Sequence, residues 1–235
     1  MTNAEILGLF EKTEFPEFLG EDNAEEFIKN KTHFPETFKF TWNMGASKLV
    51  ILPNDVDFVI KIPFNGQYRG HGIDCETGEI TSEGGWEHFT SEEYYSPEGM
   101  EFDGNYCGRE VDISNLAWEE DLDECFALTE CIGKCNEYYI YKQTKATCIL
   151  SDIEDEKRDS LTNEKKESIR SKCRELNVYC FNLLWINDFL SFFGEEILKQ
   201  LSDFLEAHNI NDLHNSNIGY IGNRPVLIDY SGFFE

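Results

Sequence analysis

The sequence is short of positive charge. It contains 20 lysine and arginine residues against 46 aspartate and glutamate residues, which gives a formal net charge of −26. A surface of this sign repels the phosphates of nucleic acids, so the composition argues against direct binding of DNA or RNA in a basic groove. The same carboxylates could face a basic surface on a partner protein, although solubility alone would also account for them.

Cysteine pairs with metal-binding spacing are missing as well. None of the eight cysteines forms a C-x-x-C pair, and the two nearest, Cys131 and Cys135, lack a second pair at zinc-finger spacing. The first ten residues contain Glu5 and no lysine or arginine, which is unlike a secretory signal. These absences favour reduced cysteines and a cytoplasmic protein, of a bacterium or of a host cell.

Long apolar runs and internal repeats are not found either. The most apolar stretch, 178–193, is interrupted by Asp188 and is too short to span a bilayer comfortably, so no membrane association is expected. What the chain does have is 40% hydrophobic residues, including 19 phenylalanines. This content excludes a mostly disordered protein, and 235 residues suffice for one domain or two small lobes.

Alternating β-branched and aromatic residues predict five strands, which together would form an antiparallel sheet. The predicted strands are 38–43, 47–52, 57–63, 126–132 and 137–143. Short helices are expected before them at 4–12 and 24–31, and another helix near Asn105. Residues 65–104 form an acidic, glycine- and aromatic-rich insertion without periodicity, which suggests a flap, a partner surface or a mobile loop.

After residue 160 the sequence predicts mainly helices. Thr162 or Asn163 can cap a helix whose apolar residues recur at three and four positions from Ile169 to Leu184. Gly194 interrupts the pattern, and a second helix is expected from 195 to 205.

That second helix leads into the most informative stretch, I-N-D-L-H-N-S-N-I-G-Y-I-G-N-R-P-V-L-I-D-Y-S-G, residues 210–232. It predicts a hairpin with strands at 218–221 and 226–228 and a Gly-Asn turn between them. Asp212 and Asn217 would lie before the hairpin, and Asp229 would follow its second strand. A chance Asx-rich loop beside a hairpin is the plainer interpretation.

This stretch resembles the catalytic segment of the protein-kinase-like superfamily. There an aspartate is followed five positions later by an asparagine, as Asp212 is by Asn217, and Asp229-Tyr230-Ser231-Gly232 stands where D-F-G would. The wording D-L-H-x-x-N followed by I-D-Y is closest to the aminoglycoside- and choline-phosphotransferase branch. The resemblance implies that Asp212 acts at the acceptor hydroxyl and that Asn217 and Asp229 hold Mg²⁺.

The strand 57–63 carries a second part of the resemblance. Strand alternation puts Phe58 and Ile60 on one face and Val59 and Lys61 on the other. Taken alone, Lys61 is most simply a lysine exposed at a sheet edge. Beside the hairpin, it resembles the V-A-I-K strand of kinases, which implies that Val59 touches the adenine and Lys61 the phosphates of ATP.

Further nucleotide-binding residues follow from the same resemblance. Gly45 and Ser47 occupy the place of the phosphate-covering loop, which here has one glycine and not G-x-G-x-x-G. Glu110, with Glu119 as the alternative, would pair with the strand lysine, although either is also explained as a solvent-facing glutamate. His208 and His214 flank the Asp212 loop, where structural histidines are commoner than metal ligands.

The resemblance implies an α+β, two-lobed kinase-like fold. Its first lobe would span 1–147, with the five-stranded antiparallel sheet, the insertion and the Glu110 helix. A mostly helical second lobe, 148–235, would carry the hairpin. The sequence shows no activation segment and no A-P-E after Gly232, so this second lobe is expected to be truncated.

Two functions are therefore predicted. The first is a minimal phosphotransferase that uses ATP and Mg²⁺ to phosphorylate a protein or a small hydroxyl compound. The second is a catalytically inactive, kinase-like acidic binding protein with a basic protein partner. An example would be a phage-encoded inhibitor of a host nucleic-acid-binding defence enzyme, as anti-CRISPR proteins are. The four polar residues Lys61, Asp212, Asn217 and Asp229 favour the first, and the charge of −26 favours the second.

Overall fold

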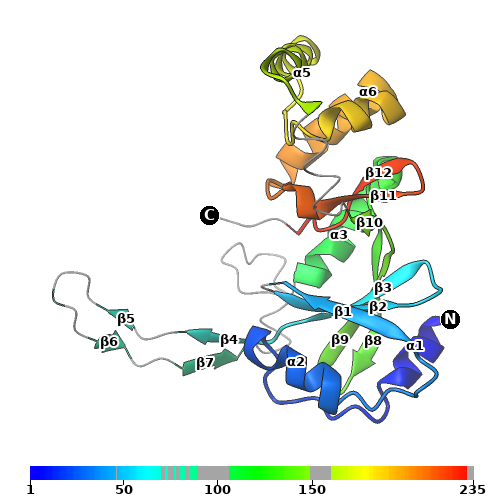
Figure 1. The fold of residues 1–235 in the computed structure, drawn as a ribbon, viewed down its shortest axis with the longest axis vertical. Coiled ribbons are helices and arrows are strands. Elements are labelled where there is room, and N and C mark those ends of the chain that lie inside the picture. Colours follow the sequence, from blue (N-terminus) through cyan, green and yellow to red (C-terminus); the bar gives the residue numbers. More distant parts are fainter. Residues whose placement is uncertain are drawn as a thin grey trace. The chain divides into compact units, whose positions relative to one another are not determined.

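The computed structural model describes residues 1–45, 47–69, 72–73, 77, 80–82, 85–88, 106–148 and 160–231. The chain divides into two compact units, which we describe separately (Figure 1). The first unit comprises Met1–Gly108 and Cys131–Lys142, and the second comprises Arg109–Glu130 and Gln143–Glu235. The predicted division into two lobes at residue 147 stays a prediction.

The protein is α+β, and its largest sheet has five strands, as predicted. The antiparallel sheet runs in the order β1-β2-β3-β9-β8. Its strands are β1 (Phe40–Met44), β2 (Lys48–Pro53), β3 (Phe58–Pro63), β8 (Thr129–Cys135) and β9 (Tyr138–Thr144). The ends Thr129–Glu130 and Gln143–Thr144 are assigned to the second unit. Each strand lies within three residues of its predicted position.

One face of this sheet is covered by two helices, α1 (Asn3–Leu9) and α2 (Glu21–Asn30). Their buried residues form one apolar cluster with alternate residues of the sheet, namely Leu49, Ile51, Phe58, Ile60, Ile62, Tyr138 and Ile140. The alternation predicted for 58–61 is therefore confirmed, because Phe58 and Ile60 belong to this cluster whereas Val59 and Lys61 do not.

Part of the predicted insertion 65–104 consists of short strand pairs. Strand β4 (Gly66–Arg69) pairs antiparallel with β7 (Gly85–His88), and β5 (Gly72–Ile73) pairs with β6 (Ile80–Ser82). Most of the remaining residues of 65–104, and Asn105, lie outside the described part of the chain. The helix expected near Asn105 is α3, Tyr106–Glu119.

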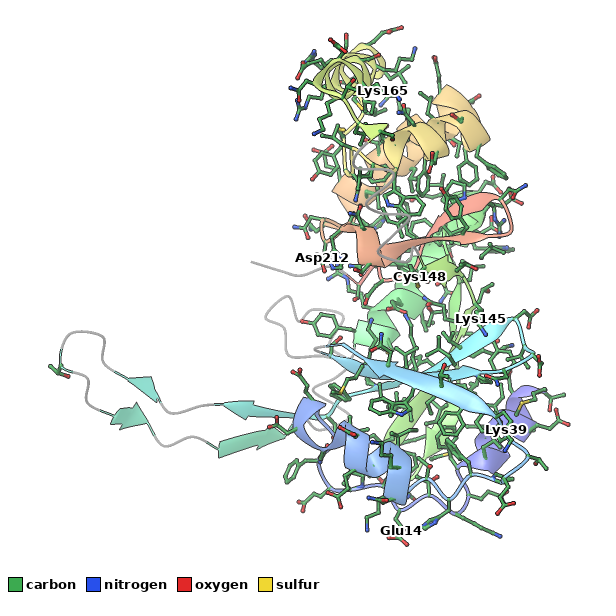
Figure 2. The ribbon with its side chains drawn as sticks, in the orientation of Figure 1. Glu14, Lys39, Lys145, Cys148, Lys165 and Asp212 are labelled. Atoms are coloured by element: carbon green, nitrogen blue, oxygen red, sulfur yellow. The ribbon has the colours of Figure 1, made fainter. Side chains whose placement is uncertain are left out.

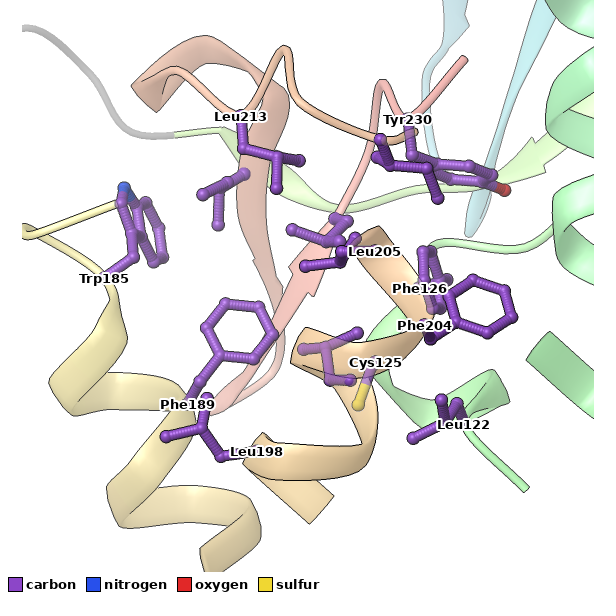
Figure 3. Packing of buried hydrophobic residues seen from close by; sticks show 14 of the residues in the cluster. Leu122, Cys125, Phe126, Trp185, Phe189, Leu198, Phe204, Leu205, Leu213 and Tyr230 are labelled. Atoms are coloured by element: carbon purple, nitrogen blue, oxygen red, sulfur yellow. The ribbon is translucent and has the colours of Figure 1, made fainter. Parts of the chain in front are cut away.

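The second unit is built around its own apolar core. Helices α3, α5 (Asn163–Leu176) and α6 (Ile186–Ala207) contribute to it, together with the 3₁₀ turn η1 (Asp123–Cys125) and the hairpin of β11 (Ile218–Ile221) and β12 (Arg224–Leu227). Phe126 packs edge-on against both Phe204 and Tyr230, with ring centroids 5.6 and 5.0 Å apart (Figure 3). Trp185 and Phe189 fill another part of the same core.

The helix that follows Thr162 is shorter than the sequence predicts. The predicted N-cap, Thr162, is confirmed, since its hydroxyl accepts a hydrogen bond from the Lys165 amide. Helix α5 nevertheless ends at Leu176, because Asn177 adopts a left-handed conformation with φ of 52°. Helical structure resumes at Ile186, and within α6 the backbone of Gly194 is not helical, with φ of 84° and ψ of 179°. The predicted interruption at Gly194, with a further helix after it, is therefore confirmed.

The hairpin of the second unit is confirmed at its predicted place. It consists of β11 (Ile218–Ile221) and β12 (Arg224–Leu227), and β10 (Thr147–Cys148) extends it to three strands. Gly222 begins the turn with φ of 63°, a region that glycine favours. At Gly219 a Cβ atom would lie 2.8 Å from the Thr147 carbonyl oxygen, so only glycine lets β10 approach this closely.

The described helices include none long and apolar enough to cross a membrane.

Candidate functional site

The Asp212 loop and the hairpin bring together the first two predicted site residues. A 3₁₀ turn, η2 (Asn215–Asn217), follows the loop and leads directly into β11. The Asn217 side chain turns back and donates from Nδ2 to the Asp212 carbonyl oxygen at 2.7 Å and to its carboxylate oxygen at 3.3 Å. Asn217 is 6% exposed, whereas the Asp212 side chain is 26% exposed. The asparagine therefore serves as a buried support beneath an accessible carboxylate.

The strand register brings Asp229 to the same end of the hairpin. Ile218 pairs with Leu227, and the next amide, that of Ile228, donates to the Asn217 carbonyl oxygen at 2.8 Å. Asp229 follows at once and is half-buried. The Ser231 hydroxyl donates to its Oδ1 atom at 3.2 Å. Asp212, Asn217 and Asp229 are thus gathered by local structure inside one unit.

An asparagine from outside the hairpin fixes the loop. Asn182, in the segment between α5 and α6, donates from Nδ2 to the Leu213 carbonyl oxygen at 2.8 Å and to the Asn215 side chain at 3.2 Å. Figure 2 labels Asp212, which lies in the loop before η2. Because the brace holds the residues on both sides of His214, it limits the backbone freedom of the loop that carries Asp212.

The two flanking histidines have different surroundings. His214 Nδ1 accepts a hydrogen bond from the Ser216 amide at 3.2 Å, which places the proton of the neutral ring on Nε2. Nε2 lies 3.8 Å from the Asp212 carboxylate. His208 instead packs on Phe204, with ring centroids 4.4 Å apart, in a structural position. No group of three or more His, Cys, Asp or Glu side chains suited to a metal ion occurs among the described residues.

The oxygen-bearing side chains at this end of the hairpin fit a hard divalent cation. Since the Asn217 amide nitrogen is used on Asp212, the orientation of the amide is fixed and its Oδ1 atom is the one suited to ligation. Asp229 adds a carboxylate. Amide and carboxylate oxygens are the donors that Mg²⁺ prefers, with water completing its shell.

A buried polar cluster in the second unit was not predicted from the sequence. It contains Glu110 and Ser114 from α3, Thr129 from β8, Gln143 from β9, and Tyr230, and we call it the Tyr230 network. All five residues are buried, and Glu110 is 0% exposed. The Tyr230 hydroxyl lies 2.7 Å from Ser114 Oγ and 3.1 Å from Thr129 Oγ1. Thr129 in turn donates to Glu110 at 2.9 Å, and Gln143 donates to Thr129 at 2.8 Å.

The network keeps Tyr230 in its neutral form. Burial raises the pKa of the Tyr230 phenol well above its ordinary value, and the nearby Glu110 carboxylate raises this pKa further. The hydrogen bonds from the neighbouring side chains lower it only in part. The phenol therefore remains a hydrogen-bond donor at any physiological pH.

The residues predicted to bind the nucleotide in the first unit lie on β3 and in the turn between β1 and β2. Lys61 and Val59 lie on β3, on the sheet face opposite α1 and α2, and are 4% and 8% exposed. Strand β3 is flanked by β2 and β9, so the interpretation of Lys61 as an edge-exposed lysine is wrong. Gly45 is exposed and Ser47 is half-buried in the turn between β1 and β2, where Ala46 is outside the described residues.

The predicted pairing of Lys61 with Glu110 stays a prediction, since the two residues belong to different units. Within the second unit, Glu110 is buried in the network, whereas the alternative, Glu119, is exposed at the end of α3. Of the two glutamates, Glu110 is therefore the buried one, and it accepts a hydrogen bond from Thr129. The residues that sequence reasoning missed are Gln143, Thr129 and Ser114, which carry no motif.

Comparison with known proteins does not assign the chain to a family. No protein-family model matches the chain, and no curated protein matches it. Among solved structures, the chain is similar to the "streptomycin-ATP-APH(2")-IIa ternary complex", with 12% sequence identity over 91% of this chain and 72% of that chain. The TM-score of this likeness is 0.29, which is too low to carry an argument about function.

Proposed function

We propose that this protein binds a nucleoside triphosphate together with Mg²⁺ and transfers a phosphoryl group to a hydroxyl acceptor. One observation carries the proposal: the end of the β11–β12 hairpin gathers Asp212, Asn217 and Asp229 within hydrogen-bonded local structure. A merely structural hairpin end would not require two carboxylates beside a buried amide. The kinase-like spacing of these residues supports the same function.

Each residue has a separate role in this proposal. Asn217 Oδ1 and a carboxylate oxygen of Asp229 would hold the cation, which neutralises the charge that develops on the phosphate oxygens. Asp212, whose side chain is partly exposed, would orient the acceptor hydroxyl and receive its proton. Its orientation is set by the Asn217 amide and by the loop that Asn182 braces.

The phosphate-binding roles of Lys61, Val59, Gly45, Ser47 and Glu110 are proposed from the kinase resemblance. The support for Lys61 is its position on β3, a central strand of the sheet, which corresponds to the V-A-I-K strand of kinases. The single glycine of the turn gives weaker support for Gly45. A Cβ atom there would meet nothing within 4 Å, so sterics do not demand glycine.

A thermal-shift titration with ATP and MgCl₂ tests nucleotide binding. A ligand at about 100 times its Kd should stabilise the protein by about 2.7 kcal/mol, with a matching rise in Tm. We expect Asp229→Ala to abolish the Mg²⁺-dependent part of this shift. Asp203→Ala is the matched control, because Asp203 is an exposed carboxylate on α6 that pairs with Lys199. No shift in the wild type, or an unchanged shift in Asp229→Ala, would contradict the proposal.

Transfer is tested separately with radiolabelled ATP. We expect slow autophosphorylation or ATP hydrolysis in the wild type and a loss of at least a hundredfold in Asp212→Ala, with nucleotide binding retained. A wild type that binds Mg-ATP without any transfer would limit the function to nucleotide binding.

A second candidate function, binding of a basic protein surface, is favoured by one feature of α3. Trp118 is 69% exposed near the end of this helix, and the following residues 119–124 include five carboxylates. The last turn of α3 has no basic residue, although cations are what a helix C-terminus favours. Exposed tryptophan surrounded by charge is a common centre of protein interfaces.

This second candidate has its own test. A fluorescently labelled lysine- and arginine-rich peptide should bind, as followed by the anisotropy of its label, with an affinity that falls as salt increases. Trp118→Ser should remove the binding, and Tyr179→Ser, at a residue 49% exposed, is the control. Unchanged affinity in Trp118→Ser would exclude this surface.

A further inference from the structure

The residues on both sides of Asp229 are held by the Tyr230 network. On one side, Gln143 Nε2 donates to the Ile228 carbonyl oxygen at 2.8 Å. On the other side, the Tyr230 hydroxyl donates to the Ala127 carbonyl oxygen at 2.9 Å. The peptide unit before Asp229 is therefore hydrogen-bonded to Gln143, and the residue after it is anchored through its side chain to another segment of the second unit.

The protons of the network can be assigned consistently. Tyr230 has one hydroxyl proton, which goes to Ala127, so Ser114 donates to the Tyr230 oxygen. Thr129 gives its proton to Glu110, and the two Gln143 protons serve Thr129 and Ile228. Each donor thus has an acceptor, and the pattern allows little rotation of any member.

Apolar packing alone would not require this arrangement. The phenylalanine that the D-F-G pattern has at this position would bury the same ring against Phe126 without any of these hydrogen bonds. Burying five polar side chains is unfavourable unless every group is satisfied, and what the network adds over apolar packing is a defined geometry. That geometry converges on the residues adjoining Asp229.

We propose that Gln143 and Tyr230 are positioning residues that set the orientation of Asp229 toward a divalent cation, without touching the cation themselves. The inference rests on the proposed function, in which Asp229 is a ligand of the divalent cation. It extends that function by making cation affinity depend on side chains from α3, β8 and β9.

The test measures Mn²⁺ binding in the presence of ATP by electron paramagnetic resonance, and ATP binding in EDTA by calorimetry. The variants are Tyr230→Phe and Gln143→Met, which keep the side-chain size and remove the hydrogen bonds. We expect the Mn²⁺ Kd to rise at least fivefold in each, while the Kd of ATP in EDTA changes less than twofold. A role limited to stability would leave the Mn²⁺ Kd of the folded protein unchanged.

Tyr220→Phe is the matched control. It removes a tyrosine hydroxyl that donates to Asp188 at 2.6 Å from strand β11, away from the network. We expect its Mn²⁺ Kd to equal that of the wild type. If Tyr230→Phe does not fold, Ser114→Ala replaces it, because it removes the hydroxyl that donates to Tyr230.

The outcomes separate the two proposals. Wild-type protein that binds Mn²⁺ and ATP, with both network variants within twofold of it, would overturn the inference and leave the proposed function intact. Wild-type protein that binds no Mn²⁺ with ATP would overturn both. An equal loss in Tyr220→Phe would also overturn the inference, because the effect would then not be specific to the network.

Discussion

At its turn, the β11–β12 hairpin exposes Gly222 and Asn223, whereas at its open end it buries Asn217 and Tyr230. The turn is determined by backbone conformation, because one glycine with positive φ suffices to reverse the chain. The open end depends on side chains that come from distant parts of the second unit. Substitutions at the two ends should therefore differ in the size of their effects and in whether they reach ligand binding.

The largest expected effect is at the open end, from Tyr230→Ala. Removing a fully buried aromatic ring should lower the free energy of unfolding by about 3–5 kcal/mol. Urea unfolding followed by circular dichroism measures this loss. Tyr179→Ala, at a half-exposed ring, should stay within about 0.5 kcal/mol of the wild type. Similar losses in the two variants would remove the distinction between buried and exposed tyrosines.

In the middle of the hairpin, Gly219→Ala should cost about 1–3 kcal/mol, because the new Cβ atom would meet the Thr147 carbonyl and force β10 away. The control is Gly8→Ala in helix α1, where a Cβ atom has open space. There the substitution should stabilise by about 0.5–1 kcal/mol, because alanine favours helix more than glycine does. Chemical denaturation of both variants tests the opposite signs.

Alkaline pH provides a third comparison. The pKa of Tyr230 is raised in the folded state above its ordinary value of 10.0. The stabilisation that comes from the neutral phenol is therefore complete below pH 10 and is lost as the pH rises from there toward the folded pKa. For one tyrosine the free energy of unfolding should fall by about 1.4 kcal/mol per pH unit in that range. Tyr230→Phe should show a slope smaller by that amount, and an equal slope would contradict the prediction.

The smallest effect is expected at the turn. Gly222→Ala must place a side chain in the left-handed region and should cost about 1 kcal/mol. Asn223→Ala, at an exposed residue, should change stability by less than about 0.5 kcal/mol. Neither substitution should alter the Mn²⁺ affinity. A change in cation binding from the turn would mean that the two ends of the hairpin are coupled.

Sequence reasoning identified the elements whose signals are local. The Gly-Asn turn predicted the hairpin, and strand alternation predicted which face of β3 carries Lys61. It extended α5 too far, because an apolar periodicity continues past Asn177 although the backbone turns left-handed there. It could not find the Tyr230 network, because Ser114 and Tyr230 are 116 positions apart and Ser114, Thr129 and Gln143 belong to no motif.

The predicted site shows the same limit. Asp212 and Asn217 are brought together by five residues of local chain, so their contact follows from spacing and turn type. The burial of Asn217 and the fixed backbone around Asp229 depend on tertiary contacts, which a single sequence does not reveal.

The brace from Asn182 has a consequence for how this protein can vary. The side-chain nitrogen of Asn182 donates to both the Leu213 carbonyl and the Asn215 side chain. A residue without a donor at position 182 would remove both hydrogen bonds and destabilise the Asp212 loop. Distant relatives that preserve the loop conformation should therefore retain an amide or hydroxyl at this place in the α5–α6 connection. That requirement offers a way to recognise such relatives even where the loop sequence itself has diverged.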